Sequence, residues 1–324
     1  MTRILYLIVI VSLSFMMPVA LAADDWSIRP RALVLIVDPW VDEAAGRSLV
    51  AHYRWNDSSQ LAQKFIDDIS AATHGQVQFE VAETIIDRDW PPFLDNIAPF
   101  NGETFVRTWE GKREFPGKCD YVTILEKHGV REKVASGQID EVWMFGFPGM
   151  GCYETRMAGD GAIWCNGPVI EDFPCSRSFV VYGFNYERDV DCMLEDLGHR
   201  AESIMAHVFR DAGPGNAWAR FTRYDKTHPG EAGCGNVHFA PNSQSDYDWG
   251  NPTYVDSTCD DWALNFPALN GLRKRVNADE WGNNDMRLHH LWWFERFPHH
   301  SGEFEGKLAN WWKYIFAWNE NRDR

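Results

Sequence analysis

Residues 178–210, SFVVYGFNYERDVDCMLEDLGHRAESIMAHVFR, predict a buried strand followed by the longest helix of the chain. The strand, 178–184, is apolar almost throughout, as expected of a strand that is covered on both faces. In 190–210 the apolar residues recur three and four positions apart, which predicts an amphipathic helix. Gly213 and Pro214 then end this helix. The stretch therefore predicts a helix that packs its apolar side against a sheet.

Segments before this stretch supply further strands of the same sheet. Residues 31–38 are a continuous apolar run, 61–72 have helical spacing, and 77–81 alternate as a strand does. A strand, a helix and a second strand in this order indicate a crossover connection and parallel pairing. Another helix is expected at 121–136 and another strand at 140–146. The predicted fold class is therefore α/β, a mainly parallel sheet with packed helices.

The character of the chain changes near residue 216. Gly, Asn, Asp, Pro and Trp dominate from there, and regular spacing returns only in a final helix expected at 306–318. Three parts are predicted: a signal peptide at 1–22, an α/β part at 23–215, and a loop-rich, Trp-rich C-terminal half at 216–324. This half is either a subdomain or a portion of the same domain.

The N-terminal residues have the pattern of a secretory signal. Arg3 precedes an apolar stretch at 4–17, Pro18 follows it, and Ala20 and Ala22 are the small residues that signal peptidase requires. An uncleaved anchor helix would need a longer apolar run. The expected location is therefore secreted or periplasmic.

Charge narrows the classes of partner. The chain has 324 residues, with 31 Lys and Arg against 47 Asp and Glu, and a net charge of −16. A protein this acidic repels phosphate backbones and anionic lipid, which disfavours nucleic acid and membrane-surface partners. No later apolar run is long enough to span a bilayer, so no membrane association is expected once the signal is cleaved.

Seven cysteines fit an oxidising compartment, and none lies in a Cys-x-x-Cys pair. Cys165 and Cys175 flank a Pro-containing loop, and Cys234 and Cys259 flank a polar loop, so these are the preferred disulfide pairs. Cys192 lies within the helical pattern and is expected to be an unpaired thiol.

Acidic and imidazole groups gather on one side of the long helix. Glu195, His199 and Glu202 fall within about 60° of one another on a helical projection, opposite the apolar stripe. A carboxylate and an imidazole one turn apart can bind the same metal ion. The alternative is a solvated helix face with ordinary ion pairs.

The segment Glu195-Asp196-Leu197-Gly198-His199 resembles the His-Glu-x-x-His helix of zincin metallopeptidases, with Glu in place of the first His and Asp in place of the catalytic Glu. The resemblance covers about ten residues and the order of strand and helix. It implies that Glu195 and His199 bind a divalent metal, with zinc favoured, and that Asp196 is the general base for a metal-bound water. Glu202 is the alternative group to orient or deprotonate that water. Gly198 in the middle of the helix suggests the close approach of another segment.

A third metal ligand would come from the second half of the chain. His238 is favoured because its loop can be fixed by a disulfide at Cys234. Other histidines in this half are His228, His289, His290, His299 and His300. The Gly-rich loop at 146–156 follows a strand and contains Glu154 and Arg156. It is expected to be either a structural turn or the rim of a substrate cleft, and in the second case Arg156 would contact the substrate.

Aromatic residues in the second half support a rival function. Trp292, Trp293, Trp311 and Trp312 lie in two short aromatic segments, and exported proteins that hold sugars use such rings as flat platforms. The alternative is that they form the core of a half poor in Leu and Ile. Three functions follow: a metal-dependent hydrolase, peptidase-like, acting on an extracellular peptide; a protein that binds or cleaves an extracellular glycan; and a non-catalytic degenerate zincin scaffold.

Overall fold

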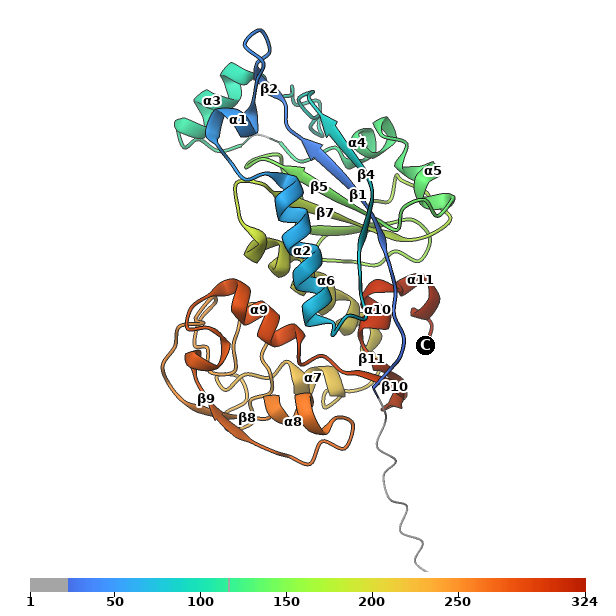
Figure 1. The fold of residues 1–324 in the computed structure, drawn as a ribbon, viewed down its shortest axis with the longest axis vertical. Coiled ribbons are helices and arrows are strands. Elements are labelled where there is room, and N and C mark those ends of the chain that lie inside the picture. The colour runs from blue at the N-terminus through green and yellow to red at the C-terminus, as the bar shows by residue number, and fades with distance from the viewer. Residues whose placement is uncertain (1–22, 116) are drawn as a thin grey trace, which may run out of the picture.

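The computed structural model describes residues 23–115 and 117–324, and a five-stranded sheet of order β4-β1-β5-β7-β6 lies at the centre of the fold (Figure 1). Its strands are β1 (Arg31–Val37), β4 (Glu80–Asp87), β5 (Glu141–Gly146), β6 (Thr155–Ala158) and β7 (Phe179–Asn185). All neighbouring pairs are parallel except β6 with β7. The predicted α/β class with a mostly parallel sheet is confirmed. The predicted signal peptide, 1–22, lies outside the described residues.

Smaller elements surround this sheet. Three two-stranded ribbons pair β2 (Trp40–Asp42) with β3 (Arg47–Ser48), β8 (Val255–Ser257) with β9 (Lys274–Val276), and β10 (His299–Phe304) with β11 (Lys307–Asn310). The helices are α1 (Leu49–Tyr53), α2 (Ser58–Ala72), α3 (Gly102–Glu110), α4 (Tyr121–Lys127), α5 (Val130–Ala135), α6 (Val190–Val208), α7 (Ala217–Phe221), α8 (Cys259–Asn265), α9 (Met286–Phe294), α10 (Trp312–Phe316), α11 (Trp318–Asn321) and the 3-10 turn η1 (Ala278–Trp281). No helix among the described residues is long and apolar enough to cross a membrane.

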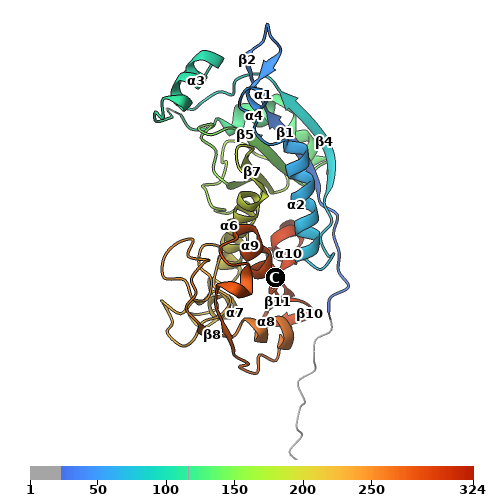
Figure 2. The same cartoon turned by 60° about the vertical axis from the view of Figure 1, so that its left-hand side comes forward.

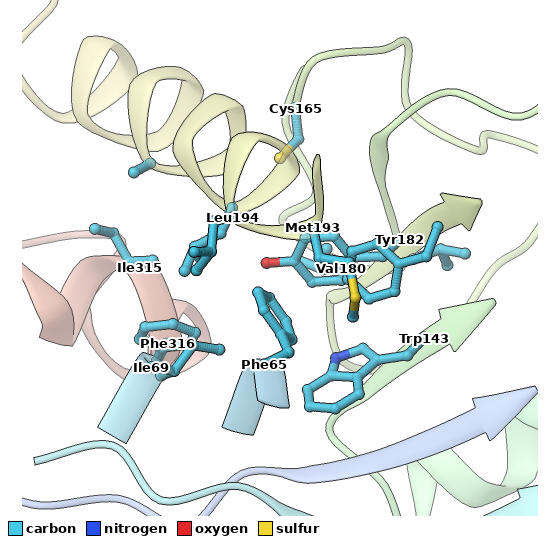
Figure 3. Close-up of a cluster of buried hydrophobic side chains, with 14 of the residues drawn as sticks. Phe65, Ile69, Trp143, Cys165, Val180, Tyr182, Met193, Leu194, Ile315 and Phe316 are labelled. Atoms are coloured by element: carbon cyan, nitrogen blue, oxygen red, sulfur yellow. The ribbon is translucent and has the colours of Figure 1, made fainter. Parts of the chain in front are cut away.

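Helix α6 lies between the sheet and the C-terminal half. It contacts β6, β7, α2, α9 and α10, and Figures 1 and 2 show it in this central position. The close-up shows side chains of α2, α6, α10 and the sheet meeting in one cluster (Figure 3). Phe65 of α2 packs edge-on against Trp143, with ring centroids 5.2 Å apart. Because its surroundings are packed, α6 is a rigid support for polar groups on its remaining face.

An ion pair is buried in this core. The Arg200 Nη1 of α6 donates to the Glu141 Oε2 at 2.7 Å, and both side chains are only 4% exposed. The guanidinium also donates to the Tyr182 hydroxyl at 3.0 Å and to the Ile315 carbonyl at 2.6 Å. Glu141 accepts a further bond from the Trp143 indole. Each of the two charges thus has an opposite charge as its partner, as buried charges must have.

Three predicted elements differ from the structure. The helix expected at 121–136 is two helices, α4 and α5, because Gly129 between them adopts a left-handed conformation. The strand expected at 77–81 begins later, as β4, and Val77 forms only an isolated bridge to Ile28. The final helix expected at 306–318 is strand β11 followed by α10, since Glu305 and Gly306 form a turn that pairs β11 with β10.

Aromatic rings form the core of the C-terminal half. Trp218, Phe221, Trp293, Phe297 and Trp311 contact one another at centroid distances between 4.8 and 6.3 Å. The buried side chains of this half belong to the same cluster as the sheet core. These rings supply the apolar area that the half does not take from Leu and Ile.

The prediction that four tryptophans form a sugar-binding platform is contradicted. Trp292, Trp293, Trp311 and Trp312 are 6%, 0%, 1% and 0% exposed. A stacking platform needs an open ring face, and these faces are covered by protein. The core-packing alternative is the one that the structure supports.

Candidate metal centre

The structure brings Glu195, His199 and His238 together. Glu195 and His199 lie one turn apart on α6, and His238 comes from the loop that follows α7. One potential ligand atom from each residue lies within 4.8 Å of the others. The His238 Nε2 is 3.0 Å from the Glu195 Oε1. Ligand atoms around a tetrahedral zinc are about 3.4 Å apart, so only small movements would close this group on an ion. That Glu195, His199 and His238 bind a metal ion remains a prediction.

Gly198 explains how the His238 loop reaches the helix. A Cβ atom at this position would lie 2.4 Å from the Cγ2 of Val237, the residue next to His238. The close approach predicted from a mid-helix glycine is confirmed. The Val237 amide donates to the Glu202 Oε1 at 3.2 Å, and the Trp293 indole donates to the Gly235 carbonyl at 3.0 Å. These bonds hold the loop against α6.

Carboxylates lie near the Nδ1 atoms of both histidines. The His199 Nδ1 is 3.2 Å from the Glu202 Oε2, within hydrogen-bond distance, whereas the His238 Nδ1 is 3.7 Å from the Asp246 Oδ1, beyond it. A carboxylate bonded to Nδ1 favours the proton on that nitrogen and the unprotonated form of Nε2, which can bind a metal. Glu202 therefore gives His199 the usual support of a metal-binding histidine, whereas the His238 Nε2 contacts Glu195 and Tyr247.

The surroundings favour a charged Glu195. Burial alone would raise its pKa, but hydrogen bonds from His238 and Tyr247 outweigh burial, and the pKa of Glu195 is lowered. The Tyr247 hydroxyl donates to the Glu195 Oε1 at 2.7 Å. For His199, burial lowers the pKa, but the bond to Glu202 and the charges of Glu202 and Glu154 reverse this, and its pKa is raised. Carboxylates thus dominate the site, as a cation requires.

A cavity of about 710 Å³ opens beside the cluster. It lies at the carboxyl end of β7, where open α/β sheets bind ligands. Its lining residues include charged, amide and aromatic side chains: Glu154, Asn185, Arg188, Glu195, Asp196, Tyr247, Trp249 and Asn284. The volume suits a small ligand or a short stretch of a polymer.

Glu154 belongs to this site as well. It lies in the loop between β5 and β6, and its Oε2 is 3.5 Å from the His199 Nε2. The Asn166 side chain donates to the same oxygen. The half-exposed carboxylate is therefore held between the cavity and the nitrogen expected to bind a metal. The sequence indicated a cleft rim at this loop, but nothing in it showed that the rim reaches α6. Tyr247 was not predicted at all, since nothing in its local sequence sets it apart.

The two predicted catalytic carboxylates have different surroundings. Asp196 lines the cavity but is buried, and burial together with the charges of Glu154 and Glu195 raises its pKa well above the usual range. A carboxyl group that keeps its proton is a poor general base. Glu202 binds His199 and the Val237 amide. Its geometry is that of a group that orients a histidine. Glu154, and not Glu202, is the carboxylate that lines the cavity next to His199.

Arg156, predicted to contact the substrate, is held elsewhere. Its Nε donates to the Pro168 carbonyl at 2.6 Å, and its Nη2 donates to the Val169 carbonyl at 2.9 Å. The guanidinium also stacks on the Tyr121 ring, 4.8 Å from the centroid. The side chain lines a separate surface cavity. Its contacts therefore fix a turn, and the prediction that it faces the substrate beside the cluster is not supported.

The other predicted residues are placed as follows. All seven cysteines are free thiols in the structure. Cys165 contacts the Thr155 hydroxyl and Cys175 contacts the Arg131 carbonyl. The two thiols of this predicted disulfide therefore bond to different groups. Cys234 and Cys259 are both buried and lie near each other. Of the alternative histidines, His228 is exposed, His289 and His290 are buried in α9, and His299 and His300 lie in β10.

We expect Gly198→Ala to weaken the site. The new methyl group would push Val237 and with it His238 away from α6, so metal affinity should fall and the free energy of unfolding should drop by about 1–3 kcal/mol. Isothermal titration with zinc and urea unfolding measure the two effects. Gly215→Ala is the matched control, because no atom lies within 4 Å of its Cβ position. The double variant Gly198→Ala/Val237→Ala should regain affinity, and unchanged zinc binding in Gly198→Ala would contradict the expected displacement.

Comparison of the chain with protein-family models, curated proteins and solved structures found no match. The function is therefore argued from the geometry of the site.

Proposed function

We propose that the chain is an exported, metal-dependent hydrolase whose metal is held by Glu195, His199 and His238. The observation that carries this proposal is the convergence of Glu195, His199 and His238, with the His238 Nε2 3.0 Å from the Glu195 Oε1 and Glu202 bonded to the His199 Nδ1. A solvated helix face would not need this arrangement, nor a loop packed against Gly198. The signal-like N-terminus supports action in a secreted or periplasmic location.

Each residue of the site has a separate role in the proposed hydrolysis. A bound divalent ion would polarise a substrate carbonyl and activate water at this place. Glu154, beside the His199 Nε2, is positioned to accept the proton of the attacking water. Tyr247 holds Glu195 through its hydroxyl, and Glu202 holds His199. The neighbouring cavity would receive the substrate.

The architecture agrees with the zincin resemblance in two respects. Two of the proposed ligands lie one turn apart on a helix that follows a strand of the sheet, and the third proposed ligand comes from later in the chain. The base differs from that implied by the resemblance, because Glu154 in a separate loop replaces the helix residue Asp196. Two nitrogen ligands and one oxygen ligand suit zinc, and they suit iron(II) as well.

An extracellular peptide is the favoured substrate, with a glycan as the alternative. The cavity presents Arg188, Asn185 and Asn284, which can bind carbonyl and hydroxyl groups of either polymer. The glycan alternative has less support, because the four tryptophans are buried and cannot stack on sugar rings. The aromatic residues that line the cavity are Tyr247 and Trp249. The peptide is therefore favoured.

Metal content tests the proposal. The purified protein is measured by elemental mass spectrometry for all first-row transition metals, beside the double variant Glu195→Ala/His199→Ala. We expect about one equivalent of zinc in the parent, with loss in the double variant. His228→Ala and Glu43→Ala remove an exposed histidine and an exposed carboxylate away from the cluster and should keep the metal.

Activity separates the three functions. The parent is incubated with peptide and glycan libraries, with and without a chelator. Chelator-sensitive peptide cleavage supports the proposal, and chelator-sensitive glycan cleavage changes the substrate class. Bound metal without cleavage of either library would indicate a non-catalytic scaffold. Absence of metal after incubation with zinc would overturn the proposed function.

A further inference from the structure

Cys119 and Cys152 lie in two segments that run side by side near the candidate site. The Cys119 amide donates to the Gly151 carbonyl at 3.1 Å. Two residues further along both segments, the Tyr153 amide donates to the Tyr121 hydroxyl at 2.7 Å. Gly151 approaches so closely that a Cβ there would lie 2.5 Å from the Gly117 carbonyl oxygen. The backbones therefore hold the two cysteines opposite each other.

The two thiols meet between these segments. The Cys119 side chain is in hydrogen-bonding contact with the Cys152 side chain. Cys119 is buried, whereas Cys152 is partly exposed and lines the cavity beside the metal centre. Among the cysteines preferred from the sequence, Cys165 and Cys175 lack such a contact with each other and bond to other groups.

We propose that Cys119 and Cys152 form a disulfide that fastens the Glu154 loop to the segment before α4. The accessible Cys152 thiolate would attack the disulfide bond of an oxidant that carries a pair of linked cysteines, form a mixed disulfide and release the oxidant's other sulfur as a thiolate. The Cys119 thiolate would then attack the Cys152 sulfur and release the oxidant as a dithiol. The two cysteines lose two electrons and two protons in total, and the oxidant's disulfide gains them.

The bond would restrict the residue that faces the metal centre. Glu154 is two residues after Cys152, and the loop that carries both runs from β5 to β6. A covalent link at Cys152 limits how far this loop can move from α6. The existence of the disulfide does not depend on the proposed hydrolase activity, and only its effect on Glu154 does.

Peptide mapping of the full chain tests the bond. The protein is purified from an oxidising compartment without reductant, alkylated with N-ethylmaleimide under denaturing conditions, and digested with trypsin. Cys119 lies in the tryptic peptide 119–127 and Cys152 in 134–156. We expect these two peptides joined, lighter by two hydrogens than their sum, and separated by reduction. Cys165 with Cys175, and Cys234 with Cys259, each share one tryptic peptide, 157–177 and 227–273, so other bonds are distinguishable.

Recovery of peptides 119–127 and 134–156 as separate alkylated species would overturn the proposal, as would a bond from either peptide to another cysteine. Cys119→Ser should leave Cys152 alkylated, and Cys152→Ser should leave Cys119 alkylated. Cys175→Ser, at a thiol that contacts the Arg131 carbonyl, should keep the joined peptides. Peptide mapping detects the covalent bond itself, so its result does not depend on whether the protein binds metal.

Discussion

Glu154→Gln should lower the turnover of the proposed hydrolase by about 10²–10⁴-fold and leave its metal content near one equivalent. The amide keeps the shape of the side chain but cannot accept the proton of the attacking water. Its oxygen lies 3.5 Å from the His199 Nε2, on the wall of the cavity. Steady-state kinetics on the cleaved substrate, with elemental analysis of the same preparation, measures both quantities.

Glu43→Gln is the control for this experiment, because Glu43 is exposed in a turn away from the cavity. Turnover of Glu154→Gln within threefold of the parent would exclude a role as base. Loss of metal together with turnover would make Glu154 a fourth ligand. A fall in turnover with the metal retained separates the base from the three ligands, whose loss should remove the metal.

Arg200→Ala should lower the free energy of unfolding by about 3–5 kcal/mol. The substitution leaves the Glu141 carboxylate in a core where its side chain is only 4% exposed, with no cation to compensate its charge. It also removes donors to the Tyr182 hydroxyl and the Ile315 carbonyl. Because Arg200 follows His199 on α6, the metal centre should weaken along with the fold.

Urea unfolding followed by circular dichroism measures this loss. Arg29→Ala breaks an exposed ion pair with Glu80 and should cost no more than about 1 kcal/mol. If Arg200→Ala does not fold, the double variant Arg200→Met/Glu141→Gln should recover stability, since it removes both charges. A cost below 1 kcal/mol for Arg200→Ala would show that the buried pair does not hold α6 on the sheet.

Local patterns in the sequence predicted what a helix or strand determines by itself. The spacing of apolar residues placed α6 within two residues of its observed end, and helical geometry placed Glu195 and His199 one turn apart. The continuous apolar run at 31–38 became β1, buried between two parallel neighbours. These predictions succeeded because the interactions concerned act within a few residues of chain.

The aromatic segments show where such patterns are ambiguous. Trp292 and Trp311 have the composition of a binding platform and of a core, and composition does not distinguish a ring that faces water from one that faces protein. Burial is decided by which segments pack together. The same holds for the cysteines, since loop spacing favoured Cys165 with Cys175, whereas adjacent backbones place Cys119 beside Cys152.

By itself the sequence determined the α/β class and the central helix, and it named the three residues expected to bind metal, with His238 favoured as the third. Only the tertiary structure decided that His238 lies beside the other two, that Glu154 faces them and that Asp196 is buried. Each of these depends on contacts between segments tens of residues apart in the chain. Such contacts arise from how a loop fits against a helix, as Val237 fits against Gly198, and this fit is a property of the packed molecule.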